Sequence, residues 1–350
     1  MRARTEFRLN EIWYGEAAPP LWLRSLVPAY RAGQRLDRWW QSRHRPDDLA
    51  AACILVVGNL TVGGTGKTPL VIRLCRLLHE AGLRPGVVSR GYGSHAPGPR
   101  LVSPASDPAV VGDEPLLIAQ QAGVPVMAAA DRCAAARSLL QRGVRVVIAD
   151  DGLQHYRLPR ALEICVIDGS RGLGNGHLLP AGPLREPADR LQRVDHIVVN
   201  GDANPLPPPY EVVHMTLVGG LLHALNGGQN WRLAQFSGCR VNAVAGIGNP
   251  RRFFDLLRHA RIKVIEHAFP DHHEYRRSDF DGMSPDLPIL MTEKDAVKCR
   301  RLDLVNAWYL SIEAVLPADW EETLLRQVLA WLEGGGSGRG NETGESHEVF

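Results

Sequence analysis

The stretch GNLTVGGTGKTPL, residues 58–70, decides the fold class of this chain. It follows CILVV, residues 53–57, a short β-branched run typical of a buried parallel strand. It leads into PLVIRLCRLLHEAG, residues 69–82, whose apolar residues recur at the helical spacing of three and four and whose Gly82 suits the end of a helix. A strand, a glycine-rich loop and a helix in this order are the setting of a phosphate-binding loop.

The residues of this loop suit the phosphates of a nucleotide. Glycines allow backbone N–H groups to turn inward around an anion, and the N-terminus of the next helix adds a partial positive charge. Lys67 would reach the β- and γ-phosphates, and the Thr68 hydroxyl would ligate Mg²⁺. Thr61 stands where the usual GxxxxGK[ST] pattern has its first glycine, and a plain glycine-rich turn is the alternative interpretation. We predict nucleotide contacts from Thr61, Gly63, Gly64, Thr65, Gly66, Lys67 and Thr68.

A second apolar run ends in two acids. VRVVIADDGLQH predicts a strand over residues 144–149 that is followed by Asp150 and Asp151. Paired carboxylates at a strand end are costly to hold together without a cation, so we interpret them as acids of an Mg²⁺ site rather than as two solvated loop residues. A third strand, EICVID, ends at Asp168 and opens into a long glycine- and proline-rich loop, where we expect substrate contacts.

Composition limits the remaining possibilities. The chain has 350 residues, 45% of them hydrophobic and 22% charged, which is enough for two ordinary domains with their own cores. A net charge of +2 gives no general case for nucleic acid as a partner. The six cysteines form no CxxC pair, which argues against a zinc knot or a disulfide framework. We find no apolar run of about 18 residues that would predict a transmembrane helix.

The first 45 residues differ from the rest. They contain four of the eight tryptophans, Trp13, Trp22, Trp39 and Trp40, and nine arginines against four acidic residues. From Leu21 a helical period places Leu23, Leu26, Val27 and Tyr30 on one face. Two interpretations remain open from these residues: a helix that lies at a membrane interface, or a helix that packs on its own domain.

The later part of the chain predicts a second, smaller α/β unit. YEVVHMTLV and NWRLAQFSG, separated by NGG, suggest a β-ribbon that continues a linker. VNAVAGIGNPRRFFDLLRHA and PILMTEKDAVK each predict a strand, a turn and a helix. We therefore expect an α/β fold with a P-loop NTPase-type α/β/α core, divided into a helical membrane-interface segment (1–45), an ATP-binding domain (46–200), a linker with the β-ribbon (201–238), a second α/β domain (239–333) and a disordered tail (334–350).

Eight motifs in order link this chain to a known family. GNLTVGGTGKTP, SRGYG, VGDEP, DDGLQH, LLPAGPLREP, GIGNP, FPDHHEY and TEKDA follow one another as they do in the tetraacyldisaccharide 4'-kinases. The chain closely resembles that family from about residue 10 to residue 330, and the family's own loop has threonine at the position of Thr61. The resemblance implies ATP- and Mg²⁺-dependent phosphorylation of the 4'-hydroxyl of a tetraacyldisaccharide 1-phosphate, giving lipid IVA for lipid A biosynthesis. It also implies a peripheral enzyme at the cytoplasmic face of the bacterial inner membrane, with no obligate protein partner evident.

The resemblance assigns roles to particular residues. Asp113 of the GDEP motif and His272 of the DH pair match residues tied to activation of the sugar hydroxyl, and Lys67 completes the predicted catalytic set. An Asp that holds a His in one tautomer makes a better base than either residue alone. His273 leaves open which histidine acts. We expect the two units to close and to bring Asp113 and His272 within hydrogen-bond reach only when substrates are bound, so that an open structure would hold them far apart. Tyr92, Arg132 and Glu186 also match motif positions, and the resemblance implies that they contact substrate or nucleotide.

Two other classes of protein compete with this interpretation. A P-loop nucleotide switch that hydrolyses ATP or GTP to act on a protein partner would need no Asp–His base in a second domain. A soluble kinase of a small metabolite would need no aromatic, basic N-terminal segment. TEKD does not support guanine specificity, because the base-reading motif of GTPases has a residue between lysine and aspartate, whereas Lys294 and Asp295 are adjacent.

Overall fold

The computed structural model describes residues 9–15, 17–91 and 98–334. The strands of its first half, called the first unit below, lie within residues 53–200. They are β1 (Cys53–Gly58), β2 (Pro85–Ser89), β3 (Arg100–Val102), β4 (Val126–Ala128), β5 (Val146–Asp150), β6 (Leu162–Asp168) and β7 (His196–Asn200). The helices around these strands are α2 (Leu21–Arg43), α3 (Lys67–Glu80), α4 (Pro108–Val111), α5 (Asp113–Gln121), α6 (Arg132–Gln141) and α9 (Ala318–Glu333), with the 3₁₀ helices η1 (Asp47–Leu49) and η2 (Ala188–Arg193).

The second half follows in the chain. Its strands are β8 (Val213–Ala224), β9 (Asn230–Arg232), β10 (Arg240–Ala245), β11 (Lys263–Ala268), β12 (Ile289–Thr292) and β13 (Ala307–Val315). Its helices are α7 (Pro250–His259) and α8 (Glu293–Cys299), with the 3₁₀ helices η3 (Leu233–Phe236) and η4 (Arg277–Phe280).

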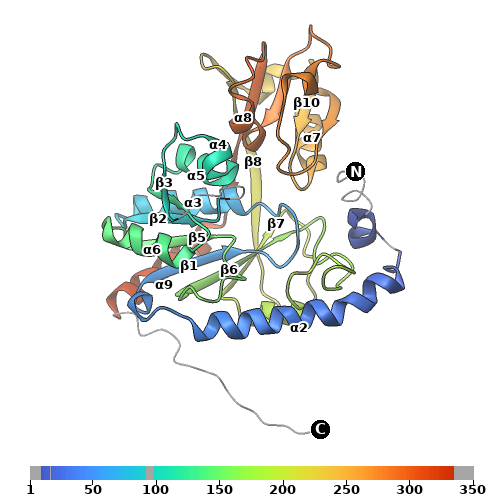
Figure 1. Ribbon diagram of the computed structural model, residues 1–350. Helices are drawn as coiled ribbons and strands as arrows, with labels where there is room; N and C mark the ends of the chain where they lie inside the picture. The colour runs from blue at the N-terminus through green and yellow to red at the C-terminus, as the bar shows by residue number, and fades with distance from the viewer. Residues whose placement is uncertain (1–8, 16, 92–97, 335–350) are drawn as a thin grey trace.

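One long strand joins the two halves into a single sheet. In the described part of the chain the strand order is β11-β10-β12-β13-β8-β7-β6-β1-β5-β2-β4-β3, with β9 attached to β8. The first residues of β8, Val213–Met215, pair in parallel with β7, and its later residues pair antiparallel with β13. β8 therefore carries the sheet from the first unit into the second, as Figure 1 shows.

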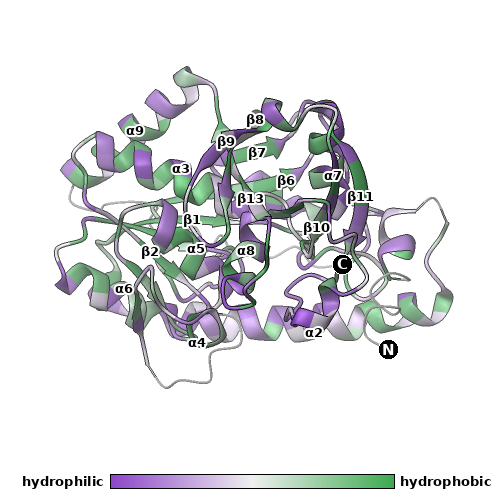
Figure 2. Ribbon diagram, turned by 90° about the horizontal axis from the view of Figure 1, so that it is seen from above, coloured by the Kyte–Doolittle hydropathy of each residue, from purple (hydrophilic) through white to green (hydrophobic). Residues whose placement is uncertain are grey.

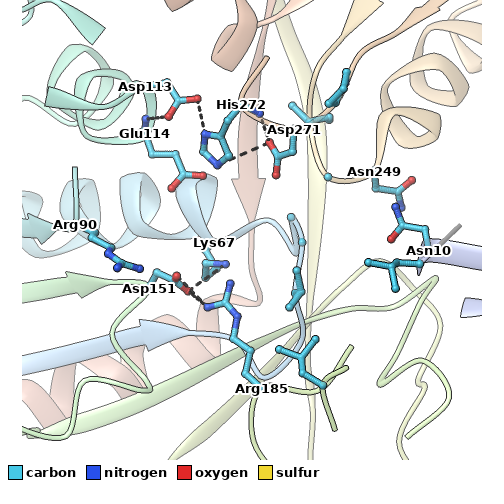
Figure 3. A pocket seen from close by; sticks show the side chains of 18 of the residues that line it. Asn10, Lys67, Arg90, Asp113, Glu114, Asp151, Arg185, Asn249, Asp271 and His272 are labelled. Carbon is cyan, nitrogen blue, oxygen red and sulfur yellow. Dashed lines mark hydrogen bonds and ion pairs between the residues drawn. The ribbon is translucent and has the colours of Figure 1, made fainter. Parts of the chain in front are cut away.

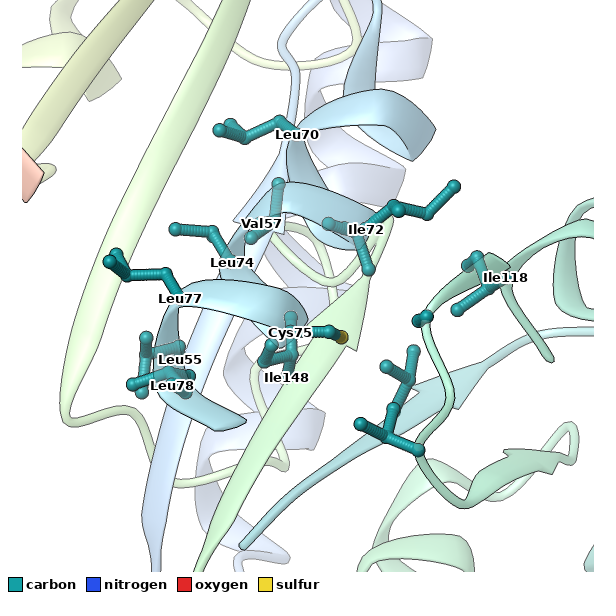
Figure 4. Close-up of a cluster of buried hydrophobic side chains, with 14 of the residues drawn as sticks. Leu55, Val57, Leu70, Ile72, Leu74, Cys75, Leu77, Leu78, Ile118 and Ile148 are labelled. Carbon is teal, nitrogen blue, oxygen red and sulfur yellow. The ribbon is translucent and has the colours of Figure 1, made fainter. Parts of the chain in front are cut away.

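The first unit has the layers expected from its hydrophobic pattern. Side chains of β1 alternate between the two faces of the sheet, so Leu55 and Val57 pack with α3 and α5, whereas Ile54 and Val56 pack with α6. Figure 4 shows the first of these clusters, in which apolar residues of α3 lie over β1 and β5. Seen from above, α3 and α9 lie on one side of the sheet and α2 and α6 on the other (Figure 2). The predicted P-loop type of α/β/α fold is confirmed.

The predicted segment boundaries stay predictions, and four observed elements differ from what the sequence pattern led us to expect. The strand expected over 144–149 runs from Val146 to Asp150, and the second ribbon strand has only three residues before η3 begins. β8 is a full member of the sheet rather than a linker. The helix α9, expected in the second unit, places Trp320, Leu324 and Val328 in the same apolar cluster as β1 and α3. Apolar spacing identifies a helix but does not say which core it joins.

The helix α2 lies along the outside of the first unit (Figure 1). Leu23 is buried, Val27 and Tyr30 pack against the cluster that contains Ile54, and the Tyr30 hydroxyl donates to the carbonyl of Arg185 at 3.0 Å. Leu26, expected on the same face, is 48% exposed. One face of α2 therefore packs on its own domain, which was the second of the two interpretations of this helix.

The opposite face of α2 is apolar and exposed. Trp22, Trp39 and Trp40 are 64%, 51% and 48% exposed, and Leu21 and Leu36 are exposed beside them. Trp13, in contrast, is buried, and its indole N–H donates to the carbonyl of Pro180 at 3.0 Å. No helix in the described ranges has the length and hydropathy needed to cross a membrane.

Candidate active site

The glycine loop and the start of α3 form a cradle that requires glycine. Gly63 and Gly66 have φ angles of +111° and +96°, in the left-handed region that other residues rarely adopt. A Cβ at Gly66 would also collide with the side chain of Asn200, which donates to the carbonyl of Thr65 at 2.9 Å. The loop therefore keeps its shape through a contact with the end of β7.

Lys67 is the first residue of α3 and its side chain is held in place by polar partners. Its Nζ donates to Oδ1 of Asn59 at 3.1 Å and lies 3.4 Å from Oδ1 of Asp151. Asn59 in turn donates to the carbonyl of Thr61 at 2.7 Å, which ties the lysine to the loop. Thr68 follows as the second residue of α3. Figure 3 shows Lys67 and Asp151 turned toward each other within the pocket.

The two adjacent acids have different environments. Asp150 ends β5 and is buried; its Oδ2 accepts from the Ser89 hydroxyl at 3.2 Å, whereas its Oδ1 has no hydrogen-bond partner in the described part of the chain. Burial, with the nearby charges of Glu114 and Asp151, raises the pKa of Asp150 to about 7. Burial would also raise the pKa of Asp151, but the charges of Lys67 and Arg185 outweigh it and hold that pKa below its ordinary value.

The residues here fit a divalent cation that nucleotide phosphates help to hold. No group of three or more His, Cys, Asp and Glu residues in the described ranges is arranged to hold a metal by itself. Mg²⁺, however, is commonly held by one or two carboxylates together with phosphates and water. The buried Oδ1 of Asp150, which lacks a partner, is the group that such a cation would satisfy.

Asp113 and His272 meet across the two units. Asp113 is the first residue of α5, and its Oδ2 lies 3.1 Å from Nδ1 of His272, which comes from the loop after β11 (Figure 3). His272 has a φ of +59°, a strained value for a residue with a Cβ. His273 turns away, with its Nε2 3.0 Å from Oδ2 of Asp279. The geometry therefore pairs His272, and not His273, with Asp113.

The charges around this pair change the pKa values of both groups. Burial would raise the pKa of Asp113, but the His272 hydrogen bond and the charges of Lys294 and Lys298 hold it below its ordinary range. The hydrogen bond to Asp113 raises the pKa of His272, against opposing effects of burial and Lys294. Asp113 is thus a carboxylate that accepts the Nδ1–H of the imidazole.

The sequence prediction did not include two lysines of the TEKDAVK motif. Lys294 Nζ lies 2.8 Å from Oε1 of Glu114 and 3.1 Å from Oδ1 of Asp271, and Lys298 Nζ lies 4.0 Å from Oδ2 of Asp113. One compositional signal could have found them. The chain has only four lysines among its 40 basic residues, and Lys67, Lys294 and Lys298 are three of them.

Of the three residues predicted to contact substrate or nucleotide, the structure describes two. Arg132 is buried and its guanidinium donates to the carbonyls of Asp150 and Asp151 at 3.3 and 3.2 Å. Glu186 is buried and accepts from the Tyr156 hydroxyl and from Nε2 of Gln154. Both line the cleft described next, and Tyr92 lies outside the described residues. No direct contact role follows from these positions, so those roles stay predictions.

A single cleft of about 2280 Å³ joins the glycine loop to the Asp113–His272 pair. Lys67 and Asp151 line it from the first unit, His272 and Gly248 line it from the second, and Tyr30 lines it from α2. The GIGNP turn closes on the glycine loop, because a Cβ at Gly248 would collide with the backbone of Gly64. Arg171 donates to the carbonyl of Gly248 at 2.8 Å. The cleft can therefore hold a nucleotide beside a second, larger molecule.

This fold and its glycine loop define a P-loop kinase. A family model described as tetraacyldisaccharide-1-P 4'-kinase matches residues 20–329. The chain belongs to this family.

Individual relatives agree with the family match. A tetraacyldisaccharide 4'-kinase of Alkalilimnicola ehrlichii is 50% identical over 306 residues, which cover 85% of this chain and 90% of the relative. One of Xanthomonas euvesicatoria is 47% identical, over 90% of this chain and 94% of the relative. A crystal structure of LpxK from Aquifex aeolicus, described as an "apo" form in complex with ATP, is similar with a TM-score of 0.69 and 26% identity, over 88% of this chain and 99% of that one.

Proposed function

We propose that this enzyme transfers the γ-phosphoryl group of ATP to the 4'-hydroxyl of a tetraacyldisaccharide 1-phosphate, in a reaction that requires Mg²⁺. The observation that carries the proposal is the single cleft in which a phosphate loop with Lys67 faces an Asp–His pair. Phosphoryl transfer needs groups that stabilise the charge on the transferring phosphoryl group, and an aligned acceptor hydroxyl beside a base that takes its proton. Both requirements have residues here, contributed by different units of the chain.

The phosphate side uses the glycine loop. The backbone N–H groups near Gly64 and Gly66 and the N-terminus of α3 favour anionic phosphates, and Lys67 adds a positive charge. Asn59 holds that ammonium at 3.1 Å, so little reorganisation is needed when charge develops on the transferring group. Arg185 shares Asp151 with Lys67, which leaves the lysine partly available for phosphate.

Asp150 and Thr68 would hold Mg²⁺, with Asp151 beside them. When bound, the ion would neutralise charge on the phosphate oxygens and orient the triphosphate of ATP. Asp150 supports this assignment because its buried Oδ1 has no hydrogen-bond partner in the described part of the chain. A bound cation would favour its carboxylate form and so oppose the burial that raises its pKa to about 7. Arg132 fixes the turn by binding the carbonyls of both acids.

His272 would accept the proton of the 4'-hydroxyl. Asp113 accepts the Nδ1–H at 3.1 Å and thereby leaves Nε2 as the proton-accepting nitrogen of the neutral imidazole. The charge that develops on the imidazole ring is stabilised by the same carboxylate. Asp113 is therefore the residue that orients the base, and His272 is the residue that would touch the acceptor.

We also propose that the enzyme lies at a membrane surface, at the cytoplasmic face of the inner membrane where an acylated acceptor would be available. The exposed indoles of Trp22, Trp39 and Trp40 support this, since aromatic rings favour the headgroup region. Tyr30, on the packed face of the same helix, lines the cleft. An acceptor could then keep its acyl chains in the bilayer while its sugar enters the site.

The decisive experiment uses the purified full-length protein with ATP, Mg²⁺ and the detergent-dispersed tetraacyldisaccharide 1-phosphate. We expect a product heavier by one phosphoryl group, detected by mass spectrometry, and no product without Mg²⁺. ATP consumed at the same rate without the acceptor would instead favour a nucleotide switch. Absence of the bisphosphate under these conditions would overturn the proposed function.

A further inference from the structure

Lys294 lies at the centre of the charged groups that surround His272. Its Nζ is 3.4 Å from Nε2 of His272, on the opposite side of the ring from the nitrogen that faces Asp113. The same ammonium is 2.8 Å from Oε1 of Glu114 and 3.1 Å from Oδ1 of Asp271. An ammonium can donate to Nε2 only when that nitrogen carries no proton. The contact therefore selects the form of the imidazole that can act as a base.

The start of α8 fixes the position of this lysine. The Thr292 hydroxyl caps the helix by accepting from the backbone N–H of Asp295 at 3.2 Å, and it donates to Oδ2 of Asp295 at 2.6 Å. Asp295 is buried and also accepts from the backbone N–H of Gly246 at 2.9 Å. The side chain of Lys294 is only 15% exposed. A capped, anchored first turn thus presents the ammonium to the Asp–His pair.

We propose that Lys294 is a positioning residue for the proposed phosphoryl transfer, which keeps Nε2 of His272 unprotonated until the acceptor hydroxyl takes the place of the ammonium. The inference rests on the proposed function. It assigns to the TEKDAVK motif a role in setting the protonation state of the base.

The balance of charges gives the direction of the effect. In the part of the chain that the structure describes, three carboxylates lie near the ring, Asp113 and Asp271 directly and Glu114 through Lys294, and each favours the imidazolium. Lys298 faces Asp113 at 4.0 Å, whereas the Nζ of Lys294 lies 3.4 Å from Nε2 of the imidazole itself. Without Lys294 the pKa of His272 would rise further. A base is most useful when its pKa lies near the working pH, so the ammonium offsets an excess of negative charge.

The test measures the protonation of His272 directly. The His272 ring proton signals would be followed by NMR as a function of pH in the wild type, in Lys294→Met, in Lys294→Arg and in Lys263→Met. Lys263 is an exposed lysine of β11 and provides the matched control. We expect the midpoint for His272 to move to higher pH by about one unit in Lys294→Met, and to stay near that of the wild type in the other two variants.

The pH profile of kcat with the lipid acceptor tests the consequence. We expect the acid limb of Lys294→Met to move to higher pH with the NMR midpoint, and the rate to recover toward that of the wild type at alkaline pH. An unchanged NMR midpoint in Lys294→Met would overturn the inference. A moved midpoint with an unmoved acid limb would overturn the role of Lys294 in the reaction. A wild type without any lipid product would overturn the proposed function itself, which the NMR titration does not depend on.

Discussion

Lys67 has two fixed partners, Asn59 at 3.1 Å and Asp151 at 3.4 Å, and both direct its ammonium toward the space in front of the glycine loop. We expect Lys67→Ala and Thr68→Ala each to reduce kcat by on the order of a hundredfold or more, because the lysine stabilises phosphoryl charge and the threonine helps to hold the cation. Turnover is measured with the lipid acceptor. Circular dichroism provides the control for folding, and near-normal turnover in both variants would contradict the phosphate-loop assignment.

Glu293 allows a second residue-scale prediction away from the reaction. It is buried in α8, where Oε1 accepts from Nε2 of Gln121 and Oε2 accepts from the backbone N–H of Ile312. Burial raises its pKa from the ordinary 4.5 to about 7, so the folded protein holds this proton more tightly than the unfolded chain does. The resulting stability is fully present below pH 4.5 and is lost as the pH rises through 7.

Replacing this carboxyl group should therefore have an effect that depends on pH. We expect Glu293→Gln to become more stable relative to the wild type on going from pH 5 to pH 8, by up to about 3 kcal/mol in the free energy of unfolding. Urea unfolding at both values of pH measures the difference. A difference that is equal at pH 5 and pH 8 would show that Glu293 does not titrate in this range.

At the scale of elements, α2 has two faces with separate roles. The packed face carries Leu23, Val27 and Tyr30, so deleting the first 40 residues would remove part of the core as well as the exposed tryptophans. Substituting the exposed tryptophans tests their role without removing the packed face of the helix. We expect the triple variant Trp22→Ala, Trp39→Ala, Trp40→Ala to sediment much less with anionic vesicles than the wild type, and to bind ATP as well as the wild type does.

Salt and a control substitution complete this test. Added salt should weaken vesicle binding by the wild type only in part, because burial of aromatic rings is not screened. Val305→Ala serves as the control, since Val305 is 80% exposed and lies in the second unit. If the triple variant bound vesicles as tightly as this control, the exposed face of α2 would not be the membrane-binding surface.

The sequence predicts individual elements better than it predicts how they are packed. The run CILVV and the helix after Lys67 lie where the pattern placed them, because alternation and helical spacing are local properties. The position of α9 over β1 and the continuity of β8 through both units depend on contacts between distant residues. The contacts of Lys294 could not be predicted for the same reason, since its partners Glu114 and Asp271 lie in two other motifs.

At the scale of the whole molecule, polar contacts hold the second unit against the first. Asn249 donates to Oδ2 of Asp168 at 3.2 Å, and Arg252 donates to the carbonyl of Asn200, at the ends of β6 and β7. The α7 end of the GIGNP turn therefore lies over the carboxyl ends of β6 and β7, at the same edge of the sheet as the phosphate loop that follows β1. The same arrangement brings the loop after β11 to α5, which is how Asp113 and His272 come to lie 3.1 Å apart.

If Asp113 and His272 act together in the reaction, their substitutions should have non-additive effects on kcat. We expect Asp113→Ala and His272→Ala each to reduce kcat severely, and the double variant to be little worse than the worse single variant, because either loss leaves the remaining partner without its function. ATP affinity should change much less than turnover, since neither residue belongs to the phosphate loop. The measurement is a double-mutant cycle on kcat with the lipid acceptor, with circular dichroism of all four proteins as the control. Losses that simply multiply would mean two independent roles, and the 3.1 Å contact would then be structural rather than part of the reaction.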